Sequence, residues 1–225
     1  MTVEVENQAN GIRIIKLTGA SASKSFSRES LPIIANAIDN GLKDSEIKGM
    51  VITGEGKFFS AGADIHAFQE AIDANDAPQL IRDLTNILHP LLMRIRESST
   101  IVVAAINGAA AGGGLGLALA CDARIASPRA KLAASYAGIG LSPDGGTTWL
   151  LPRLVGEQRS RKFFFENQIW SAEEASGAGA IDEVVEEDEL INRSLEIATD
   201  WSQWGLSLIH ISEPTRRYAI SYAVF

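Results

Sequence analysis

Two stretches rich in small residues are the parts of this sequence best suited to chemistry. They run from Phe58 to Ile65 (FFSAGADI) and from Ala104 to Ala118 (AAINGAAAGGGLGLA). Each is predicted to leave a strand, form a loop and begin a helix. Small residues let a ligand approach the backbone, and the first N–H groups of a helix are unpaired and lie at its positive end. Two such loops facing each other would stabilise an oxygen that becomes anionic, which predicts carbonyl chemistry.

These stretches resemble the enoyl-CoA hydratase/isomerase family, also called the crotonase family. The segments Ile139–Gly156 (IGLSPDGGTTWLLPRLVG) and Ser171–Ala175 (SAEEA) are similar as well, and the likeness continues to about residue 203. The resemblance implies an α/β fold, a crotonase-like spiral of repeated ββα units. It also implies an acyl-CoA-binding catalytic domain over residues 1–205.

The resemblance assigns an oxyanion hole to the N–H groups of Ala63 and Gly113. They would hold the thioester oxygen of an acyl-CoA and stabilise its enolate, and losing one such donor costs about 3–4 kcal/mol of barrier. The alternative is that the glycine triplet is only a tight turn between a strand and a helix. The residues expected to contact the substrate are Ala61, Asp64, Ile65, Gly112, Tyr136 and Leu141. Asp64 is also predicted to cap the helix that begins at Ile65.

The acid–base group departs from the hydratase pattern. The two positions where hydratases of the family carry glutamates are Gly116 and Tyr136 here. Asp144, in LSPDGG, resembles the aspartate base of the isomerase branch and the nucleophile of the aryl-CoA dehalogenases of the family. The alternative is that Asp144 serves only the turn and caps a helix beginning at Thr147.

A single carboxylate is enough for isomerisation, because Asp144 could take a proton from one carbon and return it to another. The expected function is therefore an enoyl-CoA isomerase that needs no cofactor, since CoA is part of the substrate. The alternatives are an enoyl-CoA hydratase, a CoA-thioester hydrolase or dehalogenase, and a non-catalytic CoA-binding homologue. NAD binding is disfavoured, because Leu117 and Leu119 stand where a dinucleotide fingerprint needs its third glycine.

The remaining histidines carry less weight. His66 follows the first loop and is predicted to be solvated. His89 lies between Leu88 and Pro90 on an apolar helix, and we predict a partly buried structural role for it. No metal-ligand spacing joins these residues.

The elements that must position these groups follow from hydrophobic periodicity. Helical spacing is predicted around Leu31–Leu42, over Gln79–Arg96, from the glycine triplet to Ala120, and from about Glu187 to Trp204. Strands are predicted at Gly11–Leu17, Met50–Thr53, Ile101–Ile106 and Ala123–Ala126. Strands that alternate with helices predict an α/β fold.

Composition sets further bounds. The net charge of −8 over 225 residues, without a basic stripe, disfavours a nucleic-acid partner. Cys121 is the only cysteine and lies in an apolar run, so we predict a buried, unreactive thiol. No signal peptide or membrane-spanning run is visible, and a cytoplasmic protein is expected.

Residues 206–225 (LSLIHISEPTRRYAISYAVF) do not resemble the family. Their sequence is typical of a translated sequencing adapter, and we expect a non-native tail in place of the helices that build the trimer contact; the alternative is a divergent native tail. Family members are expected to form homotrimers or hexamers. We therefore expect this chain to assemble poorly.

Overall fold

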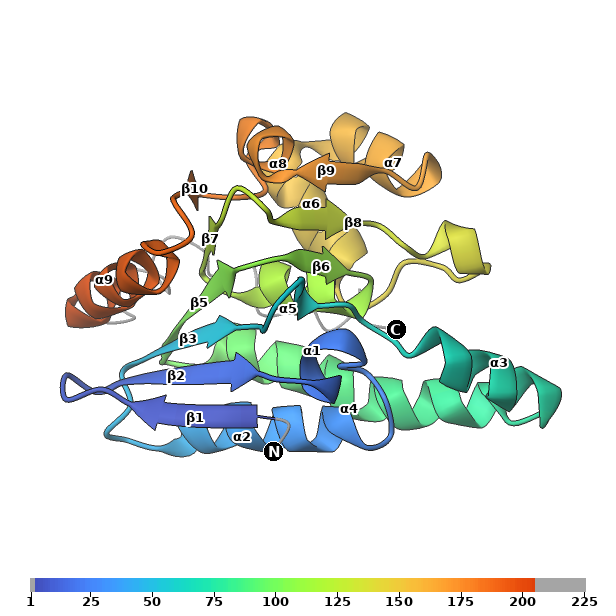
Figure 1. Ribbon diagram of the computed structural model, residues 1–225, viewed down its shortest axis with the longest axis horizontal. Helices are drawn as coiled ribbons and strands as arrows, with labels where there is room; N and C mark the ends of the chain where they lie inside the picture. The colour runs from blue at the N-terminus through green and yellow to red at the C-terminus, as the bar shows by residue number, and fades with distance from the viewer. Residues whose placement is uncertain (1–2, 205–225) are drawn as a thin grey trace.

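The computed structural model describes residues 3–204. The tail predicted to be non-native, and the assembly prediction that depends on it, lie outside these residues. Within them the chain forms two sheets with helices packed between and around them (Figure 1).

The larger sheet has the strand order β1-β2-β3-β5-β7-β10. All neighbours pair in parallel except β1 and β2. Its strands are β1 (Val3–Asn7), β2 (Ile12–Leu17), β3 (Gly49–Thr53), β5 (Ile101–Ile106), β7 (Ala123–Ala126) and β10 (Glu183–Val184). Every residue of β3, β5 and β7 is buried, as expected of parallel strands covered on both faces. The four strands predicted from the sequence are confirmed.

The smaller sheet has the order β4-β6-β8-β9. Its strands are β4 (Phe58–Ser60), β6 (Ala109–Ala111), β8 (Lys131–Ala133) and β9 (Ile169–Ser171). β4, β6 and β8 are parallel, and β9 is antiparallel to β8. The sequence analysis assigned the three alanines of β6 to a loop. They form a strand because β4 and β8 offer backbone partners on both sides, a tertiary effect that alanine side chains do not signal.

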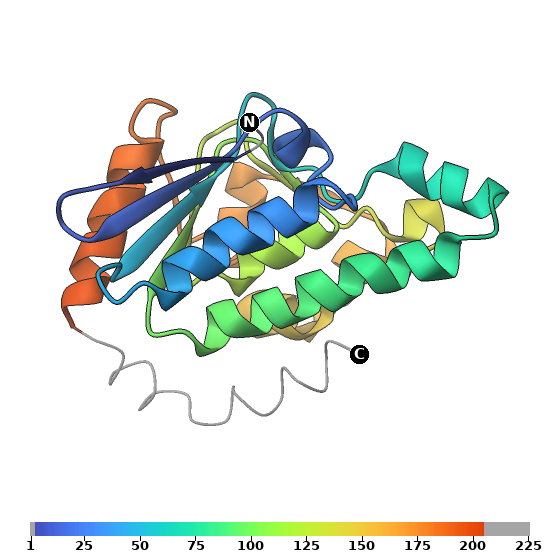
Figure 2. The same cartoon turned by 90° about the horizontal axis from the view of Figure 1, so that it is seen from below.

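Helices cover both faces of the larger sheet. One face packs on α2 (Ser30–Lys43), α4 (Ala77–Glu97) and α5 (Gly113–Ala120), as Figure 2 shows from below. The other face packs on α9 (Leu190–Gln203). Alternate residues of β3 divide between the two cores, with Met50 and Ile52 in one and Val51 in the other. The four predicted helices are confirmed.

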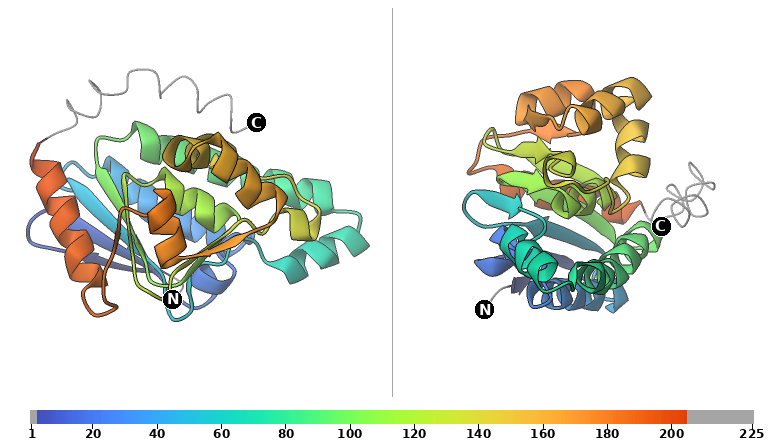
Figure 3. Two further views of the ribbon diagram at one scale, coloured as in Figure 1. Left: turned by 90° about the horizontal axis from the view of Figure 1, so that it is seen from above. Right: turned by 90° about the vertical axis from the view of Figure 1, so that its right-hand side faces the viewer.

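The remaining helices are short. They are α1 (Ala20–Ser23), α3 (Ile65–Asp73), the 3₁₀ turn η1 (Ala137–Ile139), α6 (Thr147–Val155), α7 (Glu157–Phe165) and α8 (Ala172–Ala178). α3 and the first turns of α4 project from the body as a helical hairpin, and α6 to α8 gather beside the smaller sheet (Figure 3). Cys121, just after α5, is buried, and burial raises the pKa of its thiol to about 12. The thiol therefore stays protonated, which agrees with the prediction that it is unreactive.

Candidate active site

The two small-residue loops meet because their preceding strands are neighbours. β4 and β6 pair in parallel, so their carboxyl ends lie at the same edge of the smaller sheet. The loop after β4 carries Ala61 and Ala63, and the loop after β6 carries Gly112 and Gly113. The topology thus brings together the two stretches that the sequence analysis singled out.

Glycines make this close approach possible. Gly62 has φ +79°, and a Cβ there would lie 2.5 Å from the carbonyl oxygen of Ala111 and 3.6 Å from the nitrogen of Gly113. A Cβ on Gly113 would lie 2.3 Å from the ring of Phe26. The glycines therefore do pack the loops tightly, as the turn interpretation supposed, but they also leave backbone N–H groups open.

The N–H groups of Ala63 and Gly113 are available to a ligand. Within residues 3–204 neither donates a hydrogen bond to a protein acceptor. Gly113 is the first residue of α5, where an N–H has no partner in the helix. Ala63 forms a parallel β-bridge with Phe26. The hydrogen bond of this bridge runs from the Phe26 N–H to the carbonyl of Gly62, so it does not use the Ala63 N–H.

Ala63 and Gly113 both line a cavity of about 500 Å³. Its walls come from the two loops, from α3 and α4, and from the segment that precedes α6. Eight of the nine residues that the sequence analysis selected line it: Ala61, Ala63, Ile65, Gly112, Gly113, Tyr136, Leu141 and Asp144.

Asp64 is the ninth residue, and it does not line this cavity. Its side chain accepts a hydrogen bond from the N–H of His66 at 3.1 Å, which confirms the predicted cap of α3. The Lys24 ammonium lies 2.8 Å from its carboxylate. The hydrogen bond from Lys24 holds the pKa of Asp64 below its usual value, so this carboxylate stays charged and bound to protein partners.

Asp144 lines the cavity, and its backbone carbonyl holds the turn that precedes α6. Its carbonyl oxygen accepts hydrogen bonds from Thr147 N at 3.1 Å, Thr147 Oγ1 at 2.7 Å and Tyr136 Oη at 3.3 Å. The N-cap of α6 is Gly146, and no side chain caps that helix. The alternative in which Asp144 caps a helix at Thr147 is therefore wrong, although the turn itself is present.

His89 is partly buried, as predicted, but it also lines the cavity, which the sequence analysis did not expect. Its Nε2 lies 3.9 Å from Oδ2 of Asp144, and its ring lines the same cavity. Nε2 is buried and has no hydrogen-bond partner within the described part of the chain. The sequence signal for a role in the site was a histidine beside the apolar helical face of Leu84 and Leu88. Its approach to Asp144 depends on the tertiary fold and could not be predicted.

Gly116 and Tyr136 stand where hydratases of the family carry glutamates, so neither position has a carboxylate. Gly116 also offers little room for one. A Cβ on Gly116 would lie 2.5 Å from the carbonyl oxygen of Gly145. Tyr136 is buried, and burial raises the pKa of its hydroxyl well above the usual value, with the charge of Asp144 adding to the shift. Tyr136 is therefore a neutral phenol at physiological pH and donates to the Asp144 carbonyl.

We expect Gly116→Ala to destabilise the protein, although alanine favours helices. The methyl group would overlap the Gly145 backbone, and overpacking of this kind costs about 1–3 kcal/mol. Urea unfolding would measure the loss. Gly177→Ala in α8 is the matched control, because nothing lies within 4 Å of its Cβ position. The control should gain about 0.4–1 kcal/mol, and an equal gain at Gly116 would contradict the tight contact.

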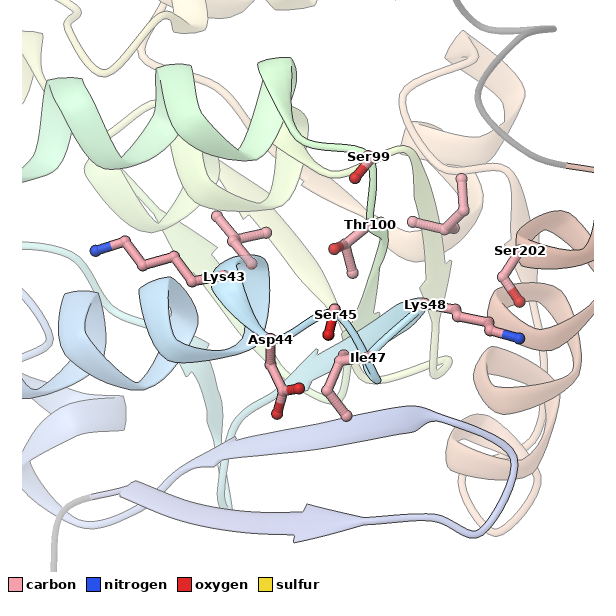
Figure 4. A pocket seen from close by; sticks show the side chains of 10 residues that line it. Lys43, Asp44, Ser45, Ile47, Lys48, Ser99, Thr100 and Ser202 are labelled. Carbon is pink, nitrogen blue, oxygen red and sulfur yellow. The ribbon is translucent and has the colours of Figure 1, made fainter.

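A second hollow of about 320 Å³ lies at the amino-terminal ends of β3 and β5 (Figure 4). It is lined largely by polar residues, and Lys43 and Lys48 point away from each other. None of the predicted site residues borders it. The predicted site residues therefore gather at the cavity that Ala63, Gly113 and Asp144 line, and not at this hollow.

The fold and site agree with one family. Residues 7–212 match the enoyl-CoA hydratase/isomerase family, and the chain belongs to it. It has the crotonase fold with two mixed sheets, and it is a crotonase-family acyl-CoA enzyme.

Relatives with different names share this fold. The chain is 35% identical over 185 residues to a probable enoyl-CoA hydratase of Mycobacterium tuberculosis, covering 82% of this chain and 70% of the relative. It is 32% identical over 202 residues to the 1,2-epoxyphenylacetyl-CoA isomerase of Escherichia coli, covering 88% and 77%. The solved structure of Pseudomonas aeruginosa DspI matches with a TM-score of 0.84 at 32% identity, covering 99% and 89%.

Two further features bear on the site. Groups of three or more histidine, cysteine, aspartate or glutamate side chains that could hold a metal ion do not occur among residues 3–204. In the same range, no helix has both the length and the apolar character needed to cross a membrane.

Proposed function

We propose that this protein is an enoyl-CoA isomerase in which Asp144 is the base and the Ala63 and Gly113 N–H groups form the oxyanion hole. One observation carries the proposal. Asp144, whose side chain does not cap α6, lines the same cavity as Ala63 and Gly113, whose N–H groups donate to no acceptor among residues 3–204. The absence of carboxylates at Gly116 and Tyr136 favours isomerisation over hydration, which needs one group to activate water and another to protonate carbon.

The reaction would run in two proton transfers. Asp144 removes a proton from carbon-2 of a 3-enoyl thioester, and the electron pair moves into the thioester to give a dienolate. The negative charge collects on the thioester oxygen, where the two N–H groups stabilise it without reorganisation. The protonated Asp144 then delivers the proton to carbon-4, and the double bond becomes conjugated with the carbonyl.

His89 favours a second candidate, a CoA-thioester hydrolase or dehalogenase. In the hydrolase, Asp144 attacks the thioester carbon, an anhydride forms and the CoA thiolate leaves. His89, 3.9 Å from Asp144, takes a proton from the water that opens the anhydride. This candidate needs His89 for chemistry, whereas the isomerase does not. His89→Gln should therefore abolish hydrolytic turnover but lower isomerisation less than about tenfold.

A substrate panel in deuterium oxide separates the candidates. The enzyme is incubated with 3-enoyl- and 2-enoyl-CoA esters, and the products are resolved by mass and by thiol release. The isomerase should give the shifted double bond with deuterium at carbon-2 or carbon-4. Water addition would indicate a hydratase, free CoA thiol a hydrolase, and binding without change a non-catalytic homologue. Each of these three results would contradict the isomerase.

A further inference from the structure

The cavity continues from the catalytic groups along one face of α4. The residues of this helix that line it are Ile81, Leu84, Thr85, Leu88 and His89, which recur at helical spacing. Leu88 marks the inner end, because its Cδ2 lies 3.2 Å from the Cβ position of Gly113. Ile81 marks the outer end. Their separation of seven positions corresponds to about 10 Å along the helix axis.

The opposite wall of this groove is the segment that leads to Asp144. Ile139 and Leu141 line the cavity there, and η1 lies over the hairpin of α3 and α4 (Figure 1). The exposed fraction rises along α4 from 4% at Leu88 and 6% at Leu84 to 37% at Ile81. The α4 wall is therefore buried at its inner end and partly exposed at its outer end.

The α4 wall of the groove offers little to a polar substituent. The only polar side chain on its α4 wall beyond His89 is Thr85, whose Oγ1 donates to the carbonyl of Ile81 at 2.8 Å. The ionisable residues that line the cavity are His89, Tyr136 and Asp144, and all three belong to the catalytic end. An apolar occupant therefore suits the α4 wall, while Ser142 is a polar side chain on the opposite segment.

The geometry points to a linear acyl chain of about ten to twelve carbons as the preferred substrate, lying along α4 from Leu88 to Ile81. An extended chain advances roughly 1.3 Å per carbon, given C–C bonds of about 1.5 Å. The groove thus holds about eight carbons beyond those at the reacting centre. This inference rests on the proposed function, because it uses the proposed position of the thioester.

Binding of S-alkyl-CoA thioethers with 2 to 16 carbons tests the inference by calorimetry. These thioethers have no carbonyl and no double bond, so their binding does not depend on the reaction. Affinity should rise about fourfold for each added methylene that becomes buried, and should level off at about ten to twelve carbons. An affinity that does not change with chain length would overturn the inference.

Three substitutions on α4 sharpen the test. Thr85→Trp blocks the groove about three residues from Leu88, so the plateau should move to about six or seven carbons. Asn86→Trp is the matched control, because Asn86 is exposed and does not line the cavity; its plateau should match that of the wild type. Ile81→Trp, at the partly exposed outer end, should change only the affinity of chains longer than about ten carbons.

The variants also distinguish two ways of failing. If Thr85→Trp weakens every thioether and free CoA alike, the groove holds the pantetheine arm and the inference is wrong. If the chain-length series behaves as expected while no 3-enoyl-CoA is isomerised, the groove assignment stands and the proposed reaction fails.

Discussion

Asp144→Asn is expected to lower kcat for isomerisation by about 10³-fold, within the range that a positioned base contributes. The amide keeps the shape of the side chain but cannot accept the proton. The fold should survive, because Thr147 and Tyr136 both donate to the Asp144 backbone carbonyl, which the substitution leaves in place. Single-turnover kinetics and binding of an unreactive CoA ester would separate the lost chemistry from the retained affinity.

Asp200→Asn serves as the control for this change. Asp200 is exposed on α9 and does not line the cavity. It should keep the wild-type rate. If Asp144→Asn also kept that rate, Asp144 would belong only to the turn, and another group would have to move the proton.

Gly113→Ala should lower kcat by about 10²-fold. A methyl group there would lie 2.3 Å from the Phe26 ring and 3.2 Å from Leu88, so the loop that carries the Gly113 N–H must shift away from the cavity. Losing an oxyanion donor costs roughly 10²–10³ in kcat.

A double-mutant cycle isolates this cause. Phe26→Leu removes the ring atoms that the methyl group would meet, so Gly113→Ala should cost less than about tenfold in that background. Rates for the four proteins give the coupling directly. Equal losses in both backgrounds would show that the clash with Phe26 does not set the position of the oxyanion hole.

Many strands and helices could be predicted from the sequence because the patterns that indicate them are local. The apolar run of β5 and the helical spacing of α4 each require a buried element, whatever surrounds it. β6 has three alanines and no such signal, and it becomes a strand only through its neighbours in the smaller sheet. The resemblance to the family supplied most of the residues that line the cavity.

Contacts between distant residues explain what the sequence did not reveal. His89 and Asp144 are 55 positions apart, and their approach depends on how α4 packs beside the segment before α6. The contact between Gly116 and Gly145 is equally non-local, and it shows why a glycine suits the position where a hydratase would carry a glutamate. Asp64 was predicted both to cap α3 and to contact substrate; the cap is present, but the residue does not line the cavity.

A structure of the Asp144→Asn variant with a bound 3-enoyl-CoA tests the central claim most directly. We expect the thioester oxygen to lie within about 3 Å of both the Ala63 and Gly113 nitrogens, the distance of a normal hydrogen bond. We also expect the side chain at position 144 to face carbon-2 or carbon-4. A thioester oxygen that contacts neither nitrogen, or an acyl chain that leaves residue 144 facing solvent, would contradict this claim.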